Sequence, residues 1–421
     1  PAFRGKRYAV LGLARSGLAT VRALVASGAH VVAWDSKDDA RASVGDGVTL
    51  SDPLEIDLTG FDGVVVSPGV PINRHPIADK AHAANVPLIG DIELFSQARP
   101  SLPPHKVIGI TGTNGKSTTT ALIHHIVETA GIPARLGGNI GLPILGQEPL
   151  PEGGVYVLEL SSYQIDLCHA LDCDIAVLLN ITPDHLDRYD GFADYAAAKE
   201  RLFTMQHVDK VAVIATEDDR TKMIASRINH RLMRVSSKQV GDQSRWPSLQ
   251  GPHNAQNVAA ARAVAEVLGI KASTIEEALH TYPGLPHRME RVRELGGVVY
   301  VNDSKATNPT STAPALAAFP AIHWILGGRA KTSELDACVP YFGHVRAAYT
   351  IGESAGMFAS LLKGSMPVSE CGSLDIAVRA ASKAAVAGET VLLSPACASF
   401  DQFTDFEARG DAFRVAVEAL A

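Results

Sequence analysis

The chain repeats one pattern: a short apolar run, a small or polar turn, and then a stretch with helical periodicity. Near the N-terminus, apolar runs at 7–11 and 30–34 flank such a helical stretch, and a third run covers 63–66. Strand, helix and parallel strand in this order are typical of a Rossmann-type unit. Helical patterns follow, and the proline-rich stretch 99–104 is typical of a linker. We therefore expect a Rossmann-like first domain over residues 1–94.

The same alternation continues through the rest of the chain. The further predicted strands are 107–110, 155–158, 175–179, 211–215, 298–302, 322–326, 347–351 and 390–394. Two prolines and a glycine interrupt the pattern at 282–286, which predicts a hinge. The chain is thus expected to form three α/β domains, with a central domain over 95–284 and a Rossmann-like C-terminal domain over 285–421.

One loop between a predicted strand and a predicted helix carries the most specific chemistry. It reads Gly112-Thr113-Asn114-Gly115-Lys116-Ser117-Thr118. Such a loop points backbone N–H groups at a phosphate, its lysine reaches the β- and γ-phosphates, and its serine can bind Mg²⁺. A strict P-loop would have glycine in place of Ile110, so the match is to a shortened motif. The sequence predicts a central domain of the P-loop ATPase type that uses ATP; the alternative is a glycine turn beside a solvated lysine.

Composition limits the class of protein. The 421 residues are 46% hydrophobic and 20% charged, with a net charge of −7, which predicts a globular protein without general attraction for nucleic acid or anionic membranes. No apolar run approaches the roughly 20 residues of a membrane span. The five cysteines are odd in number and scattered, which predicts reduced thiols. We expect a cytoplasmic, monomeric protein.

Several polar residues follow predicted strands, where open α/β sheets bind ligands. Glu159 could complete the Mg²⁺ site that Ser117 begins, with a helix-capping acid as the alternative. His185 could bind a second metal ion, although a lone histidine is more often structural. Lys199 lies in an alanine-rich helical stretch, and composition alone favours a solvated helix face there.

Two further patterns indicate ligand binding in the outer domains. Residues 12–17 with Asp35 imitate a dinucleotide-binding fingerprint, but Ala14 replaces its second glycine and hinders a close pyrophosphate, so the pattern favours a nucleotide more than NAD. Polar stretches at 302–309 and 394–401 each follow a predicted strand. Turn chemistry is the alternative for both, yet two such loops in one domain favour a pocket for a small polar substrate.

Together these motifs resemble the ATP-dependent Mur ligases, which make the peptide stem of bacterial cell-wall precursors. The resemblance covers essentially the whole chain through segments 111–118, 159–162, 182–187, 253–257 and 287–288. Segments 302–308 and 394–403 look like those of the members that add glutamate. The resemblance implies an ATP-dependent amide ligase that adds D-glutamate to UDP-N-acetylmuramoyl-L-alanine through an acyl phosphate.

The resemblance also implies roles for individual residues. Catalysis would involve Lys116, His185 and Lys199, and ATP would be held by residues 112–118 with Asn257, Arg288 and Asp303. Two Mg²⁺ ions would be bound by Ser117, Glu159, His185 and Lys199, the last as a carbamate derived from CO₂. The residues implied for the UDP-sugar are Leu13, Ala14, Arg15, Ser16, Asp35, Ser36, Gly69, Asn139 and His185. Those implied for glutamate are Thr307, Lys331, Ser399, Phe400 and Phe406.

Departures and rival interpretations also follow from the sequence. Arg329 stands where better-known members often carry an acid, and Lys37 stands where an arginine is expected. A Rossmann oxidoreductase would explain 12–17 but not 111–118, and a nucleotide switch would bind ATP without glutamate-dependent phosphate release. Folylpolyglutamate synthase also adds glutamate but lacks a UDP-type first domain. Loops of this kind do not distinguish D- from L-glutamate, and another Mur-type ligase is the alternative to the glutamate-adding reaction.

Overall fold

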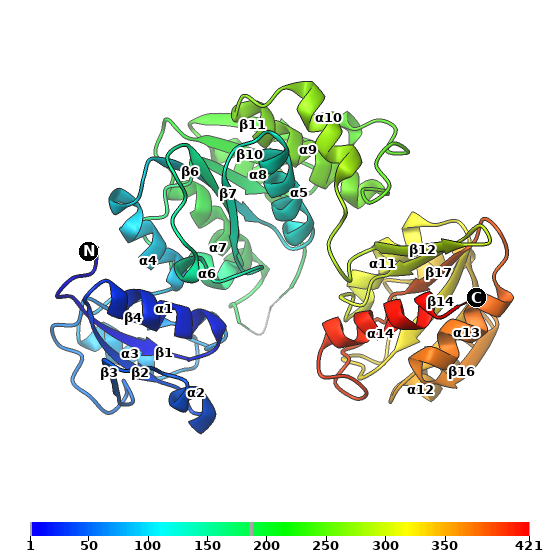
Figure 1. Ribbon diagram of the computed structural model, residues 1–421, viewed down its shortest axis with the longest axis horizontal. Coiled ribbons are helices and arrows are strands. Elements are labelled where there is room, and N and C mark those ends of the chain that lie inside the picture. Colours follow the sequence, from blue (N-terminus) through cyan, green and yellow to red (C-terminus); the bar gives the residue numbers. More distant parts are fainter. Residues whose placement is uncertain (1, 185–187, 421) are drawn as a thin grey trace. The chain divides into compact units, whose positions relative to one another are not determined.

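The computed structural model describes residues 2–184 and 188–420 (Figure 1). Its strands form three sheets, which confirms the predicted α/β class. Contacts along the chain divide it into two compact units, Pro1–Val240 with Gln256–Leu279 and Gly241–Ala255 with His280–Ala421. The first unit holds two of the sheets and the second unit holds the third.

The first sheet is parallel, in the order β3-β2-β1-β4-β5. Its elements are β1 (Arg7–Leu11), α1 (Arg15–Ala26), β2 (His30–Trp34), α2 (Asp38–Ala42), β3 (Val48–Leu50), β4 (Gly63–Val66), α3 (Ile77–Ala83), β5 (Leu88–Ile89) and α4 (Asp91–Ala98). Alternate residues of β1 pack into different cores, Tyr8 with Leu24 of α1 and Ala9 with Ile77 of α3. Because helices cover both faces, the central strands β1 and β4 are apolar and buried apart from Arg7, which begins β1.

The second sheet is also parallel, in the order β11-β10-β9-β6-β8-β7. Its strands are β6 (His105–Thr111), β7 (Ala134–Gly138), β8 (Gly154–Glu159), β9 (Ile175–Leu178), β10 (Val211–Ala215) and β11 (Arg231–Val235). The helices of this part are η1 (Arg99–Ser101), α5 (Lys116–Thr129), η2 (Ile144–Gly146), α6 (Ser162–Asp166), α7 (Phe192–Thr204), α8 (Asp219–Arg227), η3 (Ser237–Gln239), α9 (Pro252–Val267) and α10 (Ala272–Thr281). Every residue of β6 from Val107 to Thr111 is buried, so the glycine loop starts from a rigid strand.

The third sheet has the order β12-β13-β17-β14-β15-β16, and only its edge strand β12 is antiparallel. Its strands are β12 (Glu290–Leu295), β13 (Val298–Asn302), β14 (Ile322–Gly327), β15 (Val345–Ile351), β16 (Val368–Gly372) and β17 (Thr390–Leu393). Its helices are α11 (Pro309–Ala318), η4 (Val339–His344), α12 (Ala355–Leu362), α13 (Leu374–Ala384) and α14 (Phe406–Glu418). Trp324 and Ile325, neighbours on β14, pack into separate cores on the two faces.

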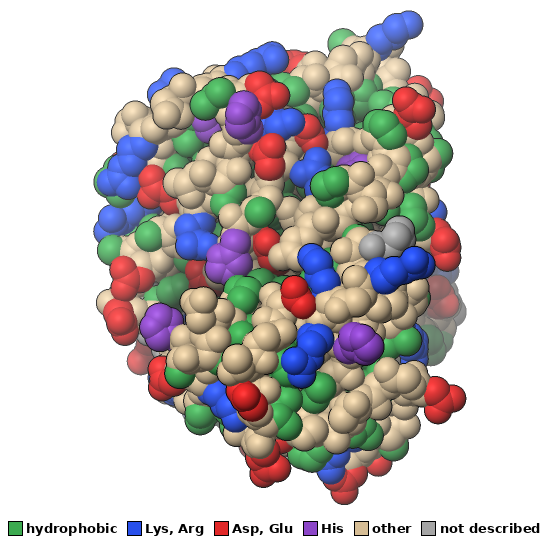
Figure 2. All heavy atoms as spheres, turned by 90° about the vertical axis from the view of Figure 1, so that its left-hand side faces the viewer, with side chains coloured by type: hydrophobic (Ala, Val, Ile, Leu, Met, Phe, Trp, Pro, Cys, Tyr) green, Lys and Arg blue, Asp and Glu red, His purple; other side chains and the backbone are tan. Residues whose placement is uncertain are grey.

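The charged side chains and the cysteines agree with what composition predicts. On the described part of the face in Figure 2, acidic and basic side chains are interspersed. All five cysteines are free thiols, and Cys371 alone among them is not buried. Within 2–184 and 188–420, none of the helices combines the length and the apolar character that crossing a membrane requires.

The turn from β1 into α1 allows a direct test of this packing. A Cβ atom on Gly17 would lie 1.9 Å from the carbonyl oxygen of Gly12, so we expect Gly17→Ala to lower the free energy of unfolding by about 2 kcal/mol or more. Urea unfolding measures the change. Gly45→Ala is the matched control, since its new Cβ would meet nothing within 4 Å. Equal stabilities for the two variants would contradict the packing of this turn.

Candidate active site

The glycine loop joins β6 to α5 and forms the N-terminus of that helix. Gly115 caps the helix with φ +82°, and a Cβ there would lie 2.4 Å from Oδ1 of Asn257. Asn257 is buried on α9, and the same Oδ1 accepts a hydrogen bond from Oγ1 of Thr119 at 3.1 Å. The loop and Asn257, both predicted to bind ATP, therefore meet, and they leave no room for a side chain at position 115.

The segment after β9 fixes the shape of the same loop. The backbone N–H of Thr113 donates to the carbonyl of Asn180 at 2.8 Å, and the N–H of Asn114 donates to Oδ1 of Asn180, also at 2.8 Å. Thr182 N–H donates to Oγ1 of Thr113 at 3.0 Å. No role was predicted for Asn180, although its position directly after a buried strand is a sequence signal for one.

Two lysines converge on one carbonyl group of the loop. Nζ of Lys116 donates to the carbonyls of Gly112 and Thr113 at 2.9 and 2.8 Å, and Nζ of Lys199 donates to Gly112 at 2.9 Å. Lys199 reaches this point from α7 and is only 1% exposed. The solvated helix face that composition alone favoured for Lys199 is therefore wrong, because the alanines of α7 let the helix pack closely and turn this lysine inward.

The surroundings of Lys199 favour its neutral amine. Burial lowers its pKa well below the ordinary value for lysine, and the positive charge of Lys116 lowers it further. Asp184, Asp166 and Glu159 act in the opposite direction but do not outweigh these causes. A neutral amine is nucleophilic, whereas a protonated one is not.

Glu159 provides a buried carboxylate beside this loop. It ends β8 and is 2% exposed, and its Oε1 accepts a hydrogen bond from Nδ2 of Asn139 at 2.8 Å. Its Oε2 is buried and has no hydrogen-bond partner among the residues that the structure describes. The helix-capping alternative is wrong, because Ser161 caps α6 through a capping box with Gln164. A buried, unpaired carboxylate oxygen fits a cation ligand.

The predicted metal set is described only in part. His185 lies outside the described residues, so the second metal site stays a prediction. Among residues 2–184 and 188–420, no group of three or more His, Cys, Asp and Glu side chains is arranged to hold a metal ion. The described residues that fit Mg²⁺ are Ser117, buried at the start of α5, and Glu159.

In the first sheet, Asp35 links two turns. Its Oδ2 accepts from Leu13 N–H at 2.8 Å and its Oδ1 accepts from Lys37 N–H at 2.9 Å. Burial raises the pKa of Asp35, but these bonds and the charges of Lys37 and Arg41 outweigh it, so the net pKa is lowered. Lys37 thus acts on Asp35 through both its N–H group and its charge. The predicted residues Ala14 and Ser36 are exposed beside this link.

The start of α1 also reaches the central sheet. Nη2 of Arg15 donates to the carbonyl of Gly141 at 3.2 Å, in the loop after β7 that carries Asn139. Ser16 and the segment after β4, which leads to Gly69, line a small cavity beside α1. The structure thus joins the turns of the first sheet to the loop of Asn139, while Gly69 itself makes no contact that fixes its role.

In the C-terminal unit, the predicted glutamate residues lie on loops that follow neighbouring strands. Thr307 follows β13, Lys331 follows β14, and Ser399 and Phe400 follow β17, while Phe406 begins α14. Ser399 is buried, whereas Lys331 and Phe400 are exposed. Nζ of Lys305 lies 3.7 Å from the centre of the Phe406 ring, a contact that sequence analysis missed. The sequence signal for Lys305 was its place in the polar stretch 302–309.

Arg329, a departure from the family pattern, does not enter this set. Its backbone pairs with Ala398 through two hydrogen bonds of 2.9 and 3.0 Å, so it joins the loops after β14 and β17. Nε of its half-exposed side chain donates to Oε2 of Glu353 at 3.2 Å.

Asp303 is buried where β13 ends. Its Oδ2 accepts from Oγ of Ser394 at 2.8 Å and its Oδ1 accepts from Met289 N–H at 3.2 Å. Burial raises its pKa to about 7, although the two hydrogen bonds and the charge of Arg288 oppose the rise. The predicted ATP residues Arg288 and Asp303 therefore lie together.

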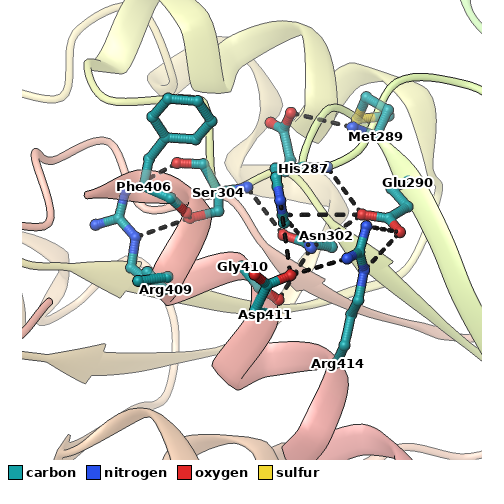
Figure 3. A network of polar contacts seen from close by, with 12 residues as sticks. His287, Met289, Glu290, Asn302, Ser304, Phe406, Arg409, Gly410, Asp411 and Arg414 are labelled. Carbon is teal, nitrogen blue, oxygen red and sulfur yellow. Dashed lines mark hydrogen bonds and ion pairs between the residues drawn. The ribbon is translucent and has the colours of Figure 1, made fainter. Parts of the chain in front are cut away.

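A polar network holds the segment that carries Arg288 (Figure 3). Nδ2 of Asn302 donates to Oε2 of Glu290 and to the carbonyl of Gly410, both at 3.1 Å. His287 adopts a left-handed φ of +61°, and a Cβ on Gly410 would lie 2.0 Å from its Nδ1. The contacts to Asn302, Glu290 and Gly410 hold this strained backbone in place.

Comparison with known proteins agrees with this geometry. Residues 110–247 match the model of the Mur ligase middle domain, and residues 287–397 match that of the Mur ligase glutamate ligase domain. The chain is 64% identical over its whole length to the UDP-N-acetylmuramoylalanine–D-glutamate ligase of Sphingopyxis alaskensis, and covers 98% of that protein. The chain belongs to the Mur ligase family. The ligase of the same name from Zymomonas mobilis is 56% identical over the whole chain, which covers 99% of that protein.

Solved structures of Mur ligases share the fold. MurF from Thermotoga maritima, solved in complex with ADP, aligns with 100% of this chain and 96% of its own at a TM-score of 0.64 and 15% identity. MurC from the same organism aligns with 98% of this chain and 99% of its own at a TM-score of 0.59 and 15% identity. This Mur ligase therefore has a Rossmann-like N-terminal part, a central part of the P-loop ATPase type and a Rossmann-like C-terminal part.

Asp303 makes the stability of this Mur ligase depend on pH in a defined direction. The raised pKa means that the folded state keeps a proton that the unfolded state loses between about pH 4 and 7, so stability falls as pH rises through that window. Asn resembles the protonated carboxyl group. We expect Asp303→Asn to raise Tm relative to the native chain by a few degrees at pH 8 and by less at pH 5.

Thermal unfolding at the two pH values measures this difference. The control is Asp375→Asn, because hydrogen bonds from Ser373 and Arg379 lower the pKa of this exposed carboxylate, so its loss gives no gain at pH 8. A larger gain at pH 5 than at pH 8 for Asp303→Asn would contradict the buried, raised carboxyl group.

Proposed function

We propose that this Mur ligase uses ATP to join D-glutamate to UDP-N-acetylmuramoyl-L-alanine. The observation that carries the proposal is the 64% identity, over the whole chain, to a ligase named for this reaction. Three separate features support it: turns of a nucleotide-binding type in the first sheet, a phosphate loop in the second, and polar loops in the third. In this proposal the turn at residues 12–17 does not bind NAD, because Ala14 replaces the glycine that the pyrophosphate of a dinucleotide would approach.

The phosphate loop is proposed to hold the triphosphate of ATP. Backbone N–H groups at the start of α5 and the helix dipole suit the β- and γ-phosphates, and Lys116 is already held within the loop at the carbonyl of Gly112. Ser117 and Glu159 would hold Mg²⁺, which when bound draws charge off the phosphate oxygens. The unpaired Oε2 of Glu159 supports this assignment, because burial of a carboxylate oxygen without a partner lowers the stability of the fold, and a bound cation would offset that loss.

The reaction is proposed to proceed by carboxylate activation. An oxygen of the alanine carboxylate attacks the γ-phosphorus of ATP, the bond to the β-γ bridging oxygen breaks, and ADP leaves from an acyl phosphate. The glutamate amine then attacks the acyl carbon and loses a proton, and inorganic phosphate departs as the amide forms. Lys116 offsets the repulsion between the carboxylate and the triphosphate in the first step. Asp184 or His185 is proposed to assist the loss of the amine proton.

Lys199 is proposed to carry a carbamate formed from CO₂. Its lowered pKa supplies the neutral amine that this addition requires, and the product is an anion where a cation stood. An anion beside Lys116 removes the like-charge repulsion between the two lysines and offers oxygen to a cation. Both lysines donate to the carbonyl of Gly112, which supports a role for a carbamate on Lys199 beside the phosphate loop.

Each outer part has a proposed substrate. The UDP-sugar would be held by Leu13, Arg15, Asp35 and the loop of Asn139. The rest of ATP would be held by Asn257, Arg288 and Asp303. Glutamate would be held by the loops with Thr307, Lys331 and Ser399. Both substrates beside the amino acid are nucleotides, which favours a cytoplasmic location. The domain boundaries at 94 and 284, the hinge at 282–286 and the monomeric state stay predictions.

Phosphate release tests the function. The protein is incubated with ATP, Mg²⁺ and UDP-N-acetylmuramoyl-L-alanine, together with D-glutamate, L-glutamate or no amino acid. We expect release that depends on D-glutamate, with a product heavier by one glutamyl residue. Release with L-glutamate alone would keep the reaction and reverse the stereochemistry. ATP binding without amino-acid-dependent release would instead support the nucleotide-switch alternative.

Substitution of Lys199 tests whether this lysine carries a carbamate. We expect Lys199→Arg, which keeps a charge but cannot be deprotonated, to lower kcat by roughly a hundredfold or more. For the native chain, activity in CO₂-depleted buffer is expected to fall most at low pH, where less of the amine is neutral, and to return with bicarbonate. The control is Lys222→Arg, an exposed lysine paired with Asp219. Full activity of Lys199→Arg, or no uptake of isotope-labelled carbonate by the native chain, would contradict the carbamate.

A further inference from the structure

A buried arginine, Arg409, forms hydrogen bonds to several segments of the C-terminal unit and has no role in the proposed reaction. It lies on α14 and is 1% exposed. Its Nε donates to Oγ of Ser304 at 3.0 Å, and its Nη2 donates to the carbonyls of Ser304 and Cys397 at 2.8 and 3.0 Å. Its Nη1 lies 3.5 Å from the carbonyl of Gly327. In Figure 3 its guanidinium lies against Ser304, apart from the ion pairs of Arg414.

These contacts reach every loop that carries a proposed glutamate residue. Ser304 follows β13, Gly327 ends β14 and Cys397 follows β17. Oγ of Ser304 also donates to the carbonyl of Phe406 at 2.8 Å, which adds the start of α14. The proposed glutamate residues on these segments are Thr307, Lys331, Ser399, Phe400 and Phe406.

The backbone closes tightly around the guanidinium. A Cβ on Gly328 would lie 2.4 Å from the carbonyl oxygen of Ala398 and 3.1 Å from Nη1 of Arg409. The backbone pairing of Arg329 with Ala398 closes the same side. A shift of any one of these loops would therefore break contacts on the others.

Fold stability alone is a weak reason for a cation at this point. Within the described part of the chain, each hydrogen-bond acceptor of Arg409 is a carbonyl or a hydroxyl group, so no hydrogen-bonded carboxylate there offsets the cost of its burial. Burial accordingly lowers the pKa of Arg409 to about 10, with Cys397 and Asp401 opposing the shift. Glutamate brings two carboxylates, and a buried positive charge where the three loops meet attracts them.

We infer that Arg409 is a positioning residue for the amino-acid substrate: its guanidinium spans the loops after β13, β14 and β17 and holds their glutamate-binding side chains in one arrangement. The inference rests on the proposed function. Arg409→Lys is an informative substitution, because lysine keeps the positive charge but lacks the planar guanidinium group that reaches several acceptors at once.

Steady-state kinetics of Arg409→Lys tests this role. We expect the KM for D-glutamate to rise roughly tenfold or more, while the KM values for ATP and UDP-N-acetylmuramoyl-L-alanine stay within about threefold and kcat falls less than the glutamate KM rises. Urea unfolding of the same preparation gives the folded fraction. An unchanged glutamate KM, or an equal change in all three KM values, would overturn the inference.

Arg293→Lys is the matched control. Nη1 of Arg293 also donates to backbone carbonyls, those of Val417, Glu418 and Leu420, but at the opposite end of α14. We expect it to lose stability without a change in the glutamate KM. An equal rise in the glutamate KM for both arginine variants would assign the effect to α14 as a whole and overturn the inference.

Ser304→Ala is the second variant, since it removes the acceptor of Nε and the link to Phe406. If Arg409→Lys does not fold, we expect the same selective rise in the glutamate KM from Ser304→Ala. Failure of both variants to fold would make Arg409 a residue of fold stability and overturn the inference. A native chain without glutamate-dependent activity would overturn the proposed function itself, which distinguishes the two failures.

Discussion

Parallel strands end in backbone groups that the sheet no longer pairs, and side chains from distant elements must satisfy these groups in the interior. In the central sheet, Lys116 and Lys199 both donate to the carbonyl of Gly112, just after β6. In the third sheet, Arg409 donates to carbonyls after β13 and β17. Cations are thus placed at the carboxyl ends of strands by backbone hydrogen bonding, which is where anionic substrates of an open α/β sheet bind.

Burial then shapes the chemistry of these groups. The same desolvation that lowers the pKa of Lys199 raises the pKa of Asp303 to about 7, because a buried site disfavours whichever form is charged. Asp35 shows the opposite balance, since two backbone N–H groups and nearby cations outweigh its partial burial. Each of these two aspartates accepts two hydrogen bonds, so the deeper burial of Asp303 decides that its pKa rises while that of Asp35 falls.

The predicted strands were those in the middle of each sheet. Strands β1, β2, β4, β6, β8, β9, β10, β13, β14, β15 and β17 coincide with predicted apolar runs. Sequence analysis missed the edge strands β3, β5, β7, β11, β12 and β16. A central strand is buried on both faces and is therefore largely apolar, whereas an edge strand such as β12 has only partly buried and exposed residues and leaves no apolar run.

The fold class, the glycine loop and the polar segments after each central strand can be predicted from the sequence, because strand burial and loop chemistry are local properties. The ATP-binding role of Asn257 is a prediction from a family resemblance, and the fold brings Asn257 against Gly115 of the glycine loop. Tertiary structure alone decided that Lys199 points inward and that Arg409 spans three loops. Both residues lie on helices whose composition suits a solvated face as well as a buried one, and only the packing of those helices against the strand ends selects between the two.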